Sequence, residues 1–545
     1  MKATDCSQSW RAVFALLSLG AALPALSAPG AEPNVLTQHN DNSRTGANLN
    51  ESQLNTSNVN VGKFGKLFTR KVDGQIYAQP LYISSLSFAG RGLHNTVIVA
   101  TEHNSVYAFD ADDPGRADPL WHTNLGPSVP IEHYGNFDVM WEEVGITGTP
   151  VIDLASSTLY AVAATLDAKG NHQHRLHALD IRTGLEKFGG PVEITGEYSD
   201  IFGNVVKSVV FKSSQHLQRA SLLLSNGSIY VAFSSHGDEL PYHGWVMSYD
   251  AATLKPLATF STTPGSQGGG IWMSGQAPAA DEAGNVYVTS GNGFFADANL
   301  AADRVDSVVK LNPASRGMTL ADWFTPSNWP ALDLFDWDFG SSGVLLIPDT
   351  RLGLTGSKSG KFYLFDLDNL GKLRTHDVGI VQEFRAVKNA YTIPWFHHIH
   401  GAPVYWRGPD TARIYVWGEQ DHLRAYRFER GRFPSTRSIS QSQAKAPFFG
   451  MPGGILSISA NGSEAGTGIV WASIPFSGDA ERAVRPGILR AFDAMDLKHE
   501  LWNSKQNARR DDVGNFAKFC PPTVVNGKVY LATFSRELAV YGLLP

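Results

Sequence analysis

The sequence predicts an all-β protein, an eight-bladed β-propeller of four-stranded antiparallel blades whose ring is closed by an N-terminal strand. Three observations predict it. One strand motif recurs eight times, each copy follows similar strand-like segments, and no helical periodicity of useful length appears after the N-terminal segment. With 545 residues, 43% of them hydrophobic, the chain can bury a large core, and its 53 glycines and 29 prolines suit many tight turns.

The recurring motif is a short β-rich segment that ends in an aromatic or aliphatic residue, usually before Asp, and is followed by a turn. Its eight copies are VYAFDADD at Val106, LHALDIRTG at Leu176, VMSYDAATL at Val246, VVKLNPASR at Val308, FYLFDLDNLG at Phe362, LRAYRFERG at Leu423, LRAFDAMDL at Leu489 and LAVYGLLP at Leu538. Their spacing of about 50 to 70 residues is within the range of propeller blades that carry loop insertions.

The strand order within a blade is clearest in the second copy, where GITGTPVID, STLYAVAAT and RLHALDIRTG precede a shorter outer strand, EKFGG. The last copy stops after its third strand. The segment KFGKLFTRKVDG, Lys63–Gly74, can supply the missing fourth strand and so remove an open sheet edge. We therefore assign residues 63–545 to one propeller and residues 29–62 to an N-terminal extension. The alternative is seven blades plus a separate hairpin, because blades three and four contain long insertions.

The first 28 residues have the pattern of a signal peptide. Lys2 and Arg11 precede the apolar run Ala12–Leu19, and small residues follow as far as a cleavage point near Ala28. The run is too short to span a bilayer, although a retained membrane anchor is the alternative. We expect a periplasmic or secreted protein with no membrane span after cleavage.

The charge balance argues against a nucleic-acid partner. The chain has 45 basic and 51 acidic residues, a net charge of −6, whereas phosphate binding needs a basic surplus. Two cysteines exclude a disulfide scaffold and a cysteine-rich metal cluster.

The repeat resembles the quinoprotein (PQQ-like) β-propeller family, and in particular an exported bacterial subfamily. LHALDIRTGLEKFGG is its best match, and GITGTPVID and HIHGAPVYW are further segments of this kind. The resemblance covers nearly all of the chain after the signal peptide. It implies the propeller fold but leaves the activity open, because such propellers serve as dehydrogenases, assembly scaffolds and binding modules.

A propeller brings two sets of loops to one face of its central channel: those that precede the first strands, and those that join the second and third strands. In this sequence both sets are rich in ionisable residues. A purely structural channel could use Ser, Thr and Gly instead. The pattern therefore indicates a site for a small-molecule or glycan ligand on the channel axis.

The resemblance also implies a cofactor, PQQ with a divalent cation, stacked on a tryptophan. Trp272, after three glycines, could form that floor, and three cations could bind the cofactor's carboxylates: Arg219, Lys358 and Arg536. Asp336 or Asp338 could be the general base. The chain departs from the family pattern in having neither an adjacent cysteine pair nor a Cys-x-x-Cys-His haem motif.

A metal site is a separate expectation. His398 and His400 are two residues apart in a predicted extended strand and would point to the same side. Glu419 and His422 follow in the adjoining loop of the same blade. Such a set suits zinc, manganese or iron. The alternative is that these histidines form hydrogen bonds with the backbone and with nearby acids.

Two functions fit the sequence. The first is an exported PQQ-dependent alcohol or sugar dehydrogenase acting at the central channel. The alternative is a non-catalytic periplasmic or secreted propeller that binds a protein partner or a glycan through the insertions SHGDELPYHGW (235–245) and GNGFFADANLAADRVD (291–306).

Overall fold

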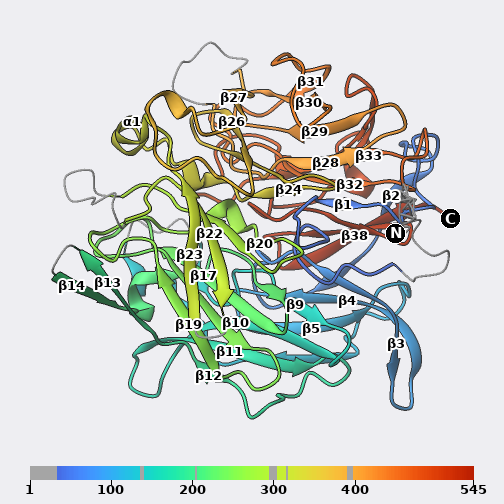
Figure 1. Cartoon of the computed structure of the whole chain (residues 1–545). Helices are drawn as coiled ribbons and strands as arrows, with labels where there is room; N and C mark the ends of the chain where they lie inside the picture. Colours follow the sequence, from blue (N-terminus) through green and yellow to red (C-terminus); the bar gives the residue numbers. More distant parts are fainter. Residues whose placement is uncertain (1–32, 136–139, 203–204, 294–302, 315–316, 389–396) are drawn as a thin grey trace, which may run out of the picture. The chain divides into compact units, whose positions relative to one another are not determined.

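The computed structural model describes residues 33–135, 140–202, 205–293, 303–314, 317–388 and 397–545. The predicted signal peptide, residues 1–28, and the start of the extension lie outside these ranges. Residues 33–545 form one compact unit. Within the described residues, eight sheets of four successive strands follow one another along the chain, which confirms the predicted eight-bladed propeller (Figure 1).

In each blade, neighbouring strands are antiparallel; in the first seven blades the four strands follow one another in chain order, whereas blade eight takes its fourth strand from the N-terminal region. The first four blades consist of β3 (Leu81–Phe88), β4 (Gly92–Ala100), β5 (Ser105–Asp110) and β6 (Trp121–Asn124); β9 (Val151–Asp153), β10 (Thr158–Leu166), β11 (His172–Asp180) and β12 (Val192–Glu193); β16 (Leu223–Ser225), β17 (Ser228–Ser235), β18 (Trp245–Asp250) and β19 (Pro256–Ser261); and β20 (Ala279–Ala280), β21 (Val286–Thr289), β22 (Val308–Ala314) and β23 (Gly317–Phe324).

The other four blades consist of β24 (Leu345–Ile347), β25 (Leu352–Gly356), β26 (Lys361–Asp366) and β27 (Gln382–Arg385); β28 (Val404–Arg407), β29 (Ala412–Val416), β30 (His422–Phe428) and β31 (Ser440–Lys445); β32 (Ile455–Ser459), β33 (Ile469–Pro475), β34 (Gly487–Asp493) and β35 (Glu500–Asn503); and β36 (Thr523–Val525), β37 (Lys528–Ala532), β38 (Glu537–Leu543) and β2 (Phe64–Lys71). The eight copies of the sequence motif are the third strands.

The remaining elements are short additions to this ring. They are β1 (Ala47–Asn48), β7 (Val129–Pro130), β8 (Glu143–Val144), β13 (Glu197–Phe202), β14 (Val205–Val210), β15 (His216–Leu217), α1 (Trp329–Leu334), α2 (Ala508–Asp511) and five single turns of 3-10 helix. The β13–β14 hairpin, green in Figure 1, is an insertion before blade three. No helix in the described part of the chain has the length and apolar character needed to cross a membrane.

The eighth blade closes the ring as predicted. β2 pairs antiparallel with β38 from Phe64 opposite Leu543 to Lys71 opposite Glu537, and Figure 1 shows the blue N-terminal strand beside the red C-terminal one. Phe64 packs edge-on against Trp502 of blade seven, with ring centroids 5.0 Å apart. The first strand of blade eight, β36, also contacts β3 of blade one. These contacts exclude the seven-bladed alternative.

The N-terminal extension has an ordered role that the sequence did not predict. Residues 35–48, here called the rim segment, form hydrogen bonds with the first strand of every blade in turn. The bonded pairs, from blade one to blade eight, are Val35–Tyr82, Leu36–Ile152, Asn42–Leu224, Asn42–Ala280, Ser43–Leu346, Thr45–Tyr405, Gly46–Ile458 and Asn48–Val524. Its side chains Gln38, His39 and Arg44 are buried. The rim segment thus runs once around the inside of the ring.

Candidate functional site at the central channel

Loops from most of the blades bring polar side chains together on the channel axis. Two adjoining cavities, of about 140 and 150 Å³, share the lining residues Asp336, Lys358, His400, Met451 and Glu481. The first is also lined by Arg219, Gly237, Asp238, Trp272, Ser274, Asp338, Ser341, Arg482 and Phe519, and the second by His398, Glu419, Phe449 and Asp479. Together the cavities reach the lower end of the range of ligand pockets, roughly 300–1,000 Å³.

These residues come from the two sets of loops that the sequence analysis selected. Arg219, Trp272, Asp338 and His400 precede the first strands of blades three to six, and Lys358 lies between the second and third strands of blade five. The rim segment bonds to positions farther along the same first strands. It therefore lies deeper in the channel than the cavities do.

Lys358 holds the two predicted base candidates together. Its Nζ lies 2.9 Å from Asp336 Oδ1 and 2.5 Å from Asp338 Oδ2. Asn292 donates to both carboxylates, from its backbone N–H to Asp338 Oδ1 (2.8 Å) and from its side-chain amide to Asp336 Oδ1 (3.0 Å). Asp336 faces the channel, with 69% of its side chain accessible to water, whereas only 10% of the Asp338 side chain is accessible.

This arrangement separates the two aspartates chemically. Burial disfavours the Asp338 carboxylate, but the charge and hydrogen bond of Lys358 outweigh it and lower its pKa below the ordinary value. The Asp336 side chain reaches water, but the protein atoms around it partly desolvate its carboxyl group; this desolvation and then the negative charge of Asp338 raise the pKa of Asp336 to about 7. Burial alone would lower the pKa of Lys358, but the two carboxylates raise it. Two acids with such divergent pKa values divide into a permanent anion and a group that can exchange a proton near neutrality.

Trp272 lies on the wall of the first cavity, in the place proposed for a flat floor. A Cβ atom on Gly270 would lie 2.9 Å from the indole Nε1, and one on Gly291 would lie 3.2 Å from its Cδ1 and 2.7 Å from Asp338 Oδ1. The glycines therefore leave room for the indole beside the carboxylate. In the same lining, the Arg219 guanidinium lies over the Phe519 ring, 4.3 Å from its centre.

The predicted metal ligands converge in part, although His398 and His400 lie in the loop before β28 and not in the strand that we expected. His398 Nδ1 lies 3.4 Å from Glu419 Oε2, and His400 Nε2 lies 3.0 Å from Glu419 Oε1. One ligand atom from each of these three residues lies within 4.8 Å of the others. Burial lowers the pKa of both histidines to about 3 and raises that of Glu419. At neutral pH both imidazoles are uncharged.

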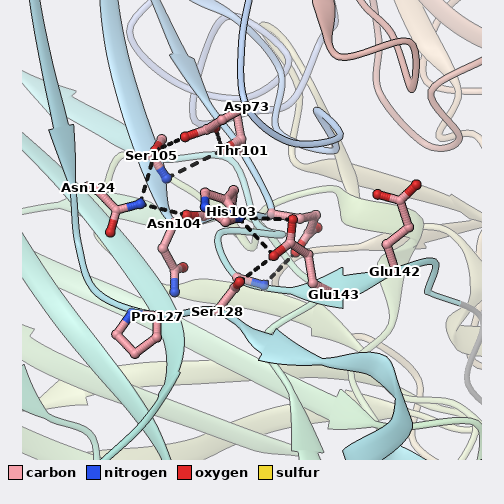
Figure 2. Close-up of polar contacts among 12 residues, drawn as sticks. Asp73, Thr101, His103, Asn104, Ser105, Asn124, Pro127, Ser128, Glu142 and Glu143 are labelled. Atoms are coloured by element: carbon pink, nitrogen blue, oxygen red, sulfur yellow. Dashed lines mark hydrogen bonds and ion pairs between the residues drawn. The ribbon is translucent and has the colours of Figure 1, made fainter.

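Two predicted residues lie elsewhere. His422 begins β30 and does not belong to the His398–His400–Glu419 group. Arg536, in the turn between β37 and β38, is 55% exposed and forms an ion pair with Glu142 Oε2 at 2.7 Å. It lines neither cavity. Figure 2 shows Glu142 near a polar network at the junction of blades one and two.

That network does not have the order of a catalytic triad. In Figure 2, Glu143 lies between its two partners: it accepts a hydrogen bond from Ser128 and contacts His103 Nδ1 at 3.0 Å. A nucleophilic serine needs the histidine in the central position, so that the imidazole can accept the hydroxyl proton. Ser128 therefore donates to a carboxylate and is not activated by His103.

The structure adds residues that sequence reasoning missed. Glu481 and Arg482 lie in the long connection between β33 and β34, and Met451 and Phe449 lie in the loop before β32. The charged letters DAER in a second-to-third-strand connection were a signal that could have identified the first two.

Comparison with known proteins identifies the fold that carries this channel. No family model and no curated protein matches the chain. Solved structures do match. Quinohemoprotein alcohol dehydrogenase from Comamonas testosteroni is 14% identical with a TM-score of 0.60, and the alignment covers 94% of this chain and 80% of that one. The chain has the fold of the quinoprotein dehydrogenases.

Two further structures agree. The quinohemoprotein alcohol dehydrogenase of Pseudomonas putida HK5 is 15% identical with a TM-score of 0.55, with 94% of this chain and 80% of that one covered. A europium-containing methanol dehydrogenase is 13% identical with a TM-score of 0.56, with 94% and 98% covered. The resemblance inferred from the repeat is thus confirmed for the fold, and the chemistry has to be argued from the site.

Proposed function

We propose that the chain is an exported quinoprotein-like oxidoreductase, periplasmic or secreted, that oxidises an alcohol or a sugar at the central channel with PQQ as its cofactor. One juxtaposition carries the proposal: a carboxylate that titrates near neutrality, Asp336, lies on the same cavity as the Trp272 indole and three cationic side chains. A flat ring, a proton acceptor and anion-binding groups are what quinone-dependent oxidation requires of a protein.

The residues around the cavity fit a planar polyanion. Trp272 contributes an aromatic ring to the lining, and Arg219 and Arg482 offer charge to carboxylates, whereas Lys358 is paired with Asp336 and Asp338. The same lining contains four acids, Asp238, Asp336, Asp338 and Glu481, so its formal charge is negative when all of them are ionised. An anionic cofactor therefore needs an accompanying cation, which agrees with the proposed pairing of PQQ with a divalent ion.

Residues of the chain itself would accept the hydroxyl proton of the substrate. Oxidation of an alcohol removes the proton of the hydroxyl group and, from the carbon that bears it, a hydrogen together with two electrons. The quinone, when bound, would accept the two electrons. Asp336 would accept the hydroxyl proton, since it faces the channel and its pKa is about 7. Lys358 and the Asn292 amide hold that carboxylate in a fixed orientation. Asp338 would remain an anion and hold Lys358.

The test is a titration of the purified chain with PQQ and Ca²⁺, followed by absorbance, and then dye-linked oxidation of a panel of alcohols and sugars. We expect Trp272→Ala and Arg219→Ala to weaken quinone binding. Asp336→Asn should leave binding intact and lower kcat by roughly 10²–10⁴-fold. Arg536→Ala is the matched control, because this arginine pairs with Glu142 away from the cavities. Failure of the wild-type chain to bind PQQ would contradict the proposal.

One observation supports non-catalytic sugar binding as a second candidate. Gly237 and Asp238, from an insertion in which we expected contacts, line the first cavity beside Trp272 and Phe519. Aromatic faces and carboxylates together suit sugar rings and hydroxyls. Residues 294–302 of the other insertion lie outside the described residues. Saturable sugar binding by calorimetry without PQQ binding or turnover would favour this candidate.

A further inference from the structure

We infer that His398, His400 and Glu419 form a binding site for a borderline divalent metal ion such as Zn²⁺, Mn²⁺ or Fe²⁺, with a coordination position open to the second cavity. The inference is independent of quinone binding, because it rests on the geometry and chemistry of these three side chains.

The two His–Glu separations are close to those between ligands of a small divalent ion, and one ligand atom from each of the three residues lies within 4.8 Å of the others. Ligands about 2.0–2.1 Å from a tetrahedral zinc ion lie roughly 3.3 Å from one another. The two His–Glu separations are 3.4 and 3.0 Å, with one carboxylate oxygen facing each imidazole. The two imidazole rings lie 5.7 Å apart at 72°, in an edge-to-face arrangement.

A simple histidine–glutamate hydrogen bond explains this geometry less well. The 3.4 Å separation at His398 is long for a charge-assisted hydrogen bond. At His400, Nε2 is buried and 3.0 Å from Glu419 Oε1, yet it makes no hydrogen bond of acceptable geometry among the described residues. Two ligand atoms that lie close together without forming a hydrogen bond are suited to binding one metal ion between them.

The backbone fixes the two segments that carry the ligands. The N–H of Glu419 donates to the carbonyl oxygen of His398 at 2.9 Å. Gly418 permits this approach, because a Cβ atom there would lie 2.9 Å from that oxygen and 2.5 Å from a methyl group of Val387. His398 and His400 lie in the loop before β28, and Glu419 lies in the turn between β29 and β30, so this bond ties the two ligand-bearing segments to each other beside the second cavity.

The donor set selects the class of ion. Two imidazoles and one carboxylate suit zinc, manganese and iron, whereas calcium takes six to eight oxygen ligands. An ion in this site would therefore differ in kind from the calcium that would accompany PQQ in the titration above.

The surroundings favour a cation and leave it accessible. The second cavity is lined by Asp336, Asp479 and Glu481 in addition to Glu419, against the single ammonium of Lys358. Lys358 is already held by Asp336 and Asp338. Three protein ligands with a position left for water or substrate is the pattern of catalytic sites, whereas structural zinc sites are closed by four. A substrate hydroxyl in the cavity could bind there.

The experiment uses the full chain without a histidine tag. After removal of metal with a chelator, the protein is titrated with Zn²⁺ by calorimetry, and bound Co²⁺ is followed by its visible absorption. We expect one ion per chain, displacement of Co²⁺ by Zn²⁺, and no displacement by excess Ca²⁺. Glu419→Gln, nearly the same shape, and His400→Ala should each weaken Zn²⁺ binding by at least roughly 100-fold.

His422→Ala is the matched control, because His422 is in the same blade but outside the ligand group. It should bind Zn²⁺ like the wild type. Thermal unfolding of the metal-free variants, compared with the metal-free wild type, separates ligand loss from misfolding. The inference would be overturned by a wild type that takes up no stoichiometric Zn²⁺, by folded Glu419→Gln protein that binds it as tightly, or by loss of binding in His422→Ala.

Discussion

Lys358 gives the two channel aspartates different roles although they are two residues apart. Its ammonium group lies closer to Asp338, which is buried and also accepts the Asn292 backbone N–H, so that carboxyl ionises first. The resulting negative charge adds to burial in raising the pKa of Asp336 to about 7. The pKa that suits Asp336 to act as the base of the proposed reaction is thus set by its neighbours and not by the carboxyl group itself.

This coupling predicts the pH dependence of the proposed reaction. Asp336 must be ionised to accept a proton, so kcat/KM should rise with pH, about tenfold per unit, until it levels near pH 7. In the Asp338→Asn variant the neighbouring negative charge is absent, and Lys358 can form its ion pair with Asp336 alone. Both changes favour the Asp336 carboxylate, and we expect the acidic limb to move to lower pH. The measurement is kcat/KM of dye-linked oxidation between pH 5 and 9.

Lys361→Met is a suitable control for this prediction. Lys361 forms an ion pair with Glu383 at 3.1 Å in the same blade but outside both cavities. Its removal should not move the profile. An acidic limb that stays at the same pH in Asp338→Asn would show that another group is the base.

The sequence predicts which side chains reach the channel where their position in the repeat determines their location. Trp272, Asp338 and His400 precede first strands, and this position alone directs them to the axis. The rule could not place Arg536, since its turn lies beside Glu142 of a different loop. It missed Met451, which precedes the first strand of blade seven in the same way, because only polar and aromatic side chains were considered as site residues.

At the scale of elements, the rim segment shows how an irregular stretch becomes buried. It lacks a repeat, yet it bonds to the first strand of all eight blades. Arg44 is fully buried in it, and its guanidinium donates to the carbonyl oxygens of Pro278 (2.7 and 3.0 Å) and Gln38 (2.8 Å) and to the Thr37 hydroxyl (2.8 Å). These acceptors compensate for burying the charge. Burial nevertheless lowers the Arg44 pKa to about 9, although Asp41 opposes this.

Arg44→Met tests that role. The substitution keeps an unbranched, apolar side-chain stem but removes the guanidinium, and so leaves the buried oxygens of Pro278, Gln38 and Thr37 without their donor. We expect the free energy of unfolding to fall by about 3 kcal/mol. Denaturant unfolding followed by tryptophan fluorescence measures it.

The comparison variant is Arg351→Met, which removes an exposed arginine from a surface ion pair with Asp368. Its effect on the free energy of unfolding should be much smaller than that of Arg44→Met, because an exposed ion pair contributes little to stability. Equal destabilisation by the two substitutions would mean that the bonds of Arg44 to the rim contribute no more than a surface contact.

The strands were predictable where the rim segment was not, for a physical reason. The third strands carry alternating or continuous apolar residues that must be buried between blades, so their pattern survives in the sequence. All six residues of β5, for example, are buried. The rim segment is held mainly by backbone hydrogen bonds, which almost any residue can make, and so it leaves little trace in composition.

At the scale of the whole molecule, the N-terminal region closes the ring in two different ways, through β2 and through the rim segment, and we call these the two closures. β2 completes the sheet of blade eight and covers the edge of β38 over eight residues. The rim segment ties the inner strands together but completes no blade. Loss of β2 should expose an unpaired edge that can pair with another chain, whereas loss of the rim segment should weaken the ring without opening it.

A truncation series separates these contributions. Chains beginning at residues 29, 51 and 75 retain both closures, β2 alone, or neither. We expect the second chain to remain monomeric, with a lower Tm because the bonds to the eight first strands are lost. The third should aggregate through β38, because its edge is then uncovered and Trp502 has lost the packing of Phe64. Size-exclusion chromatography and thermal unfolding measure both effects. A monomeric third chain with the Tm of the second would show that the ring does not depend on its N-terminal strand.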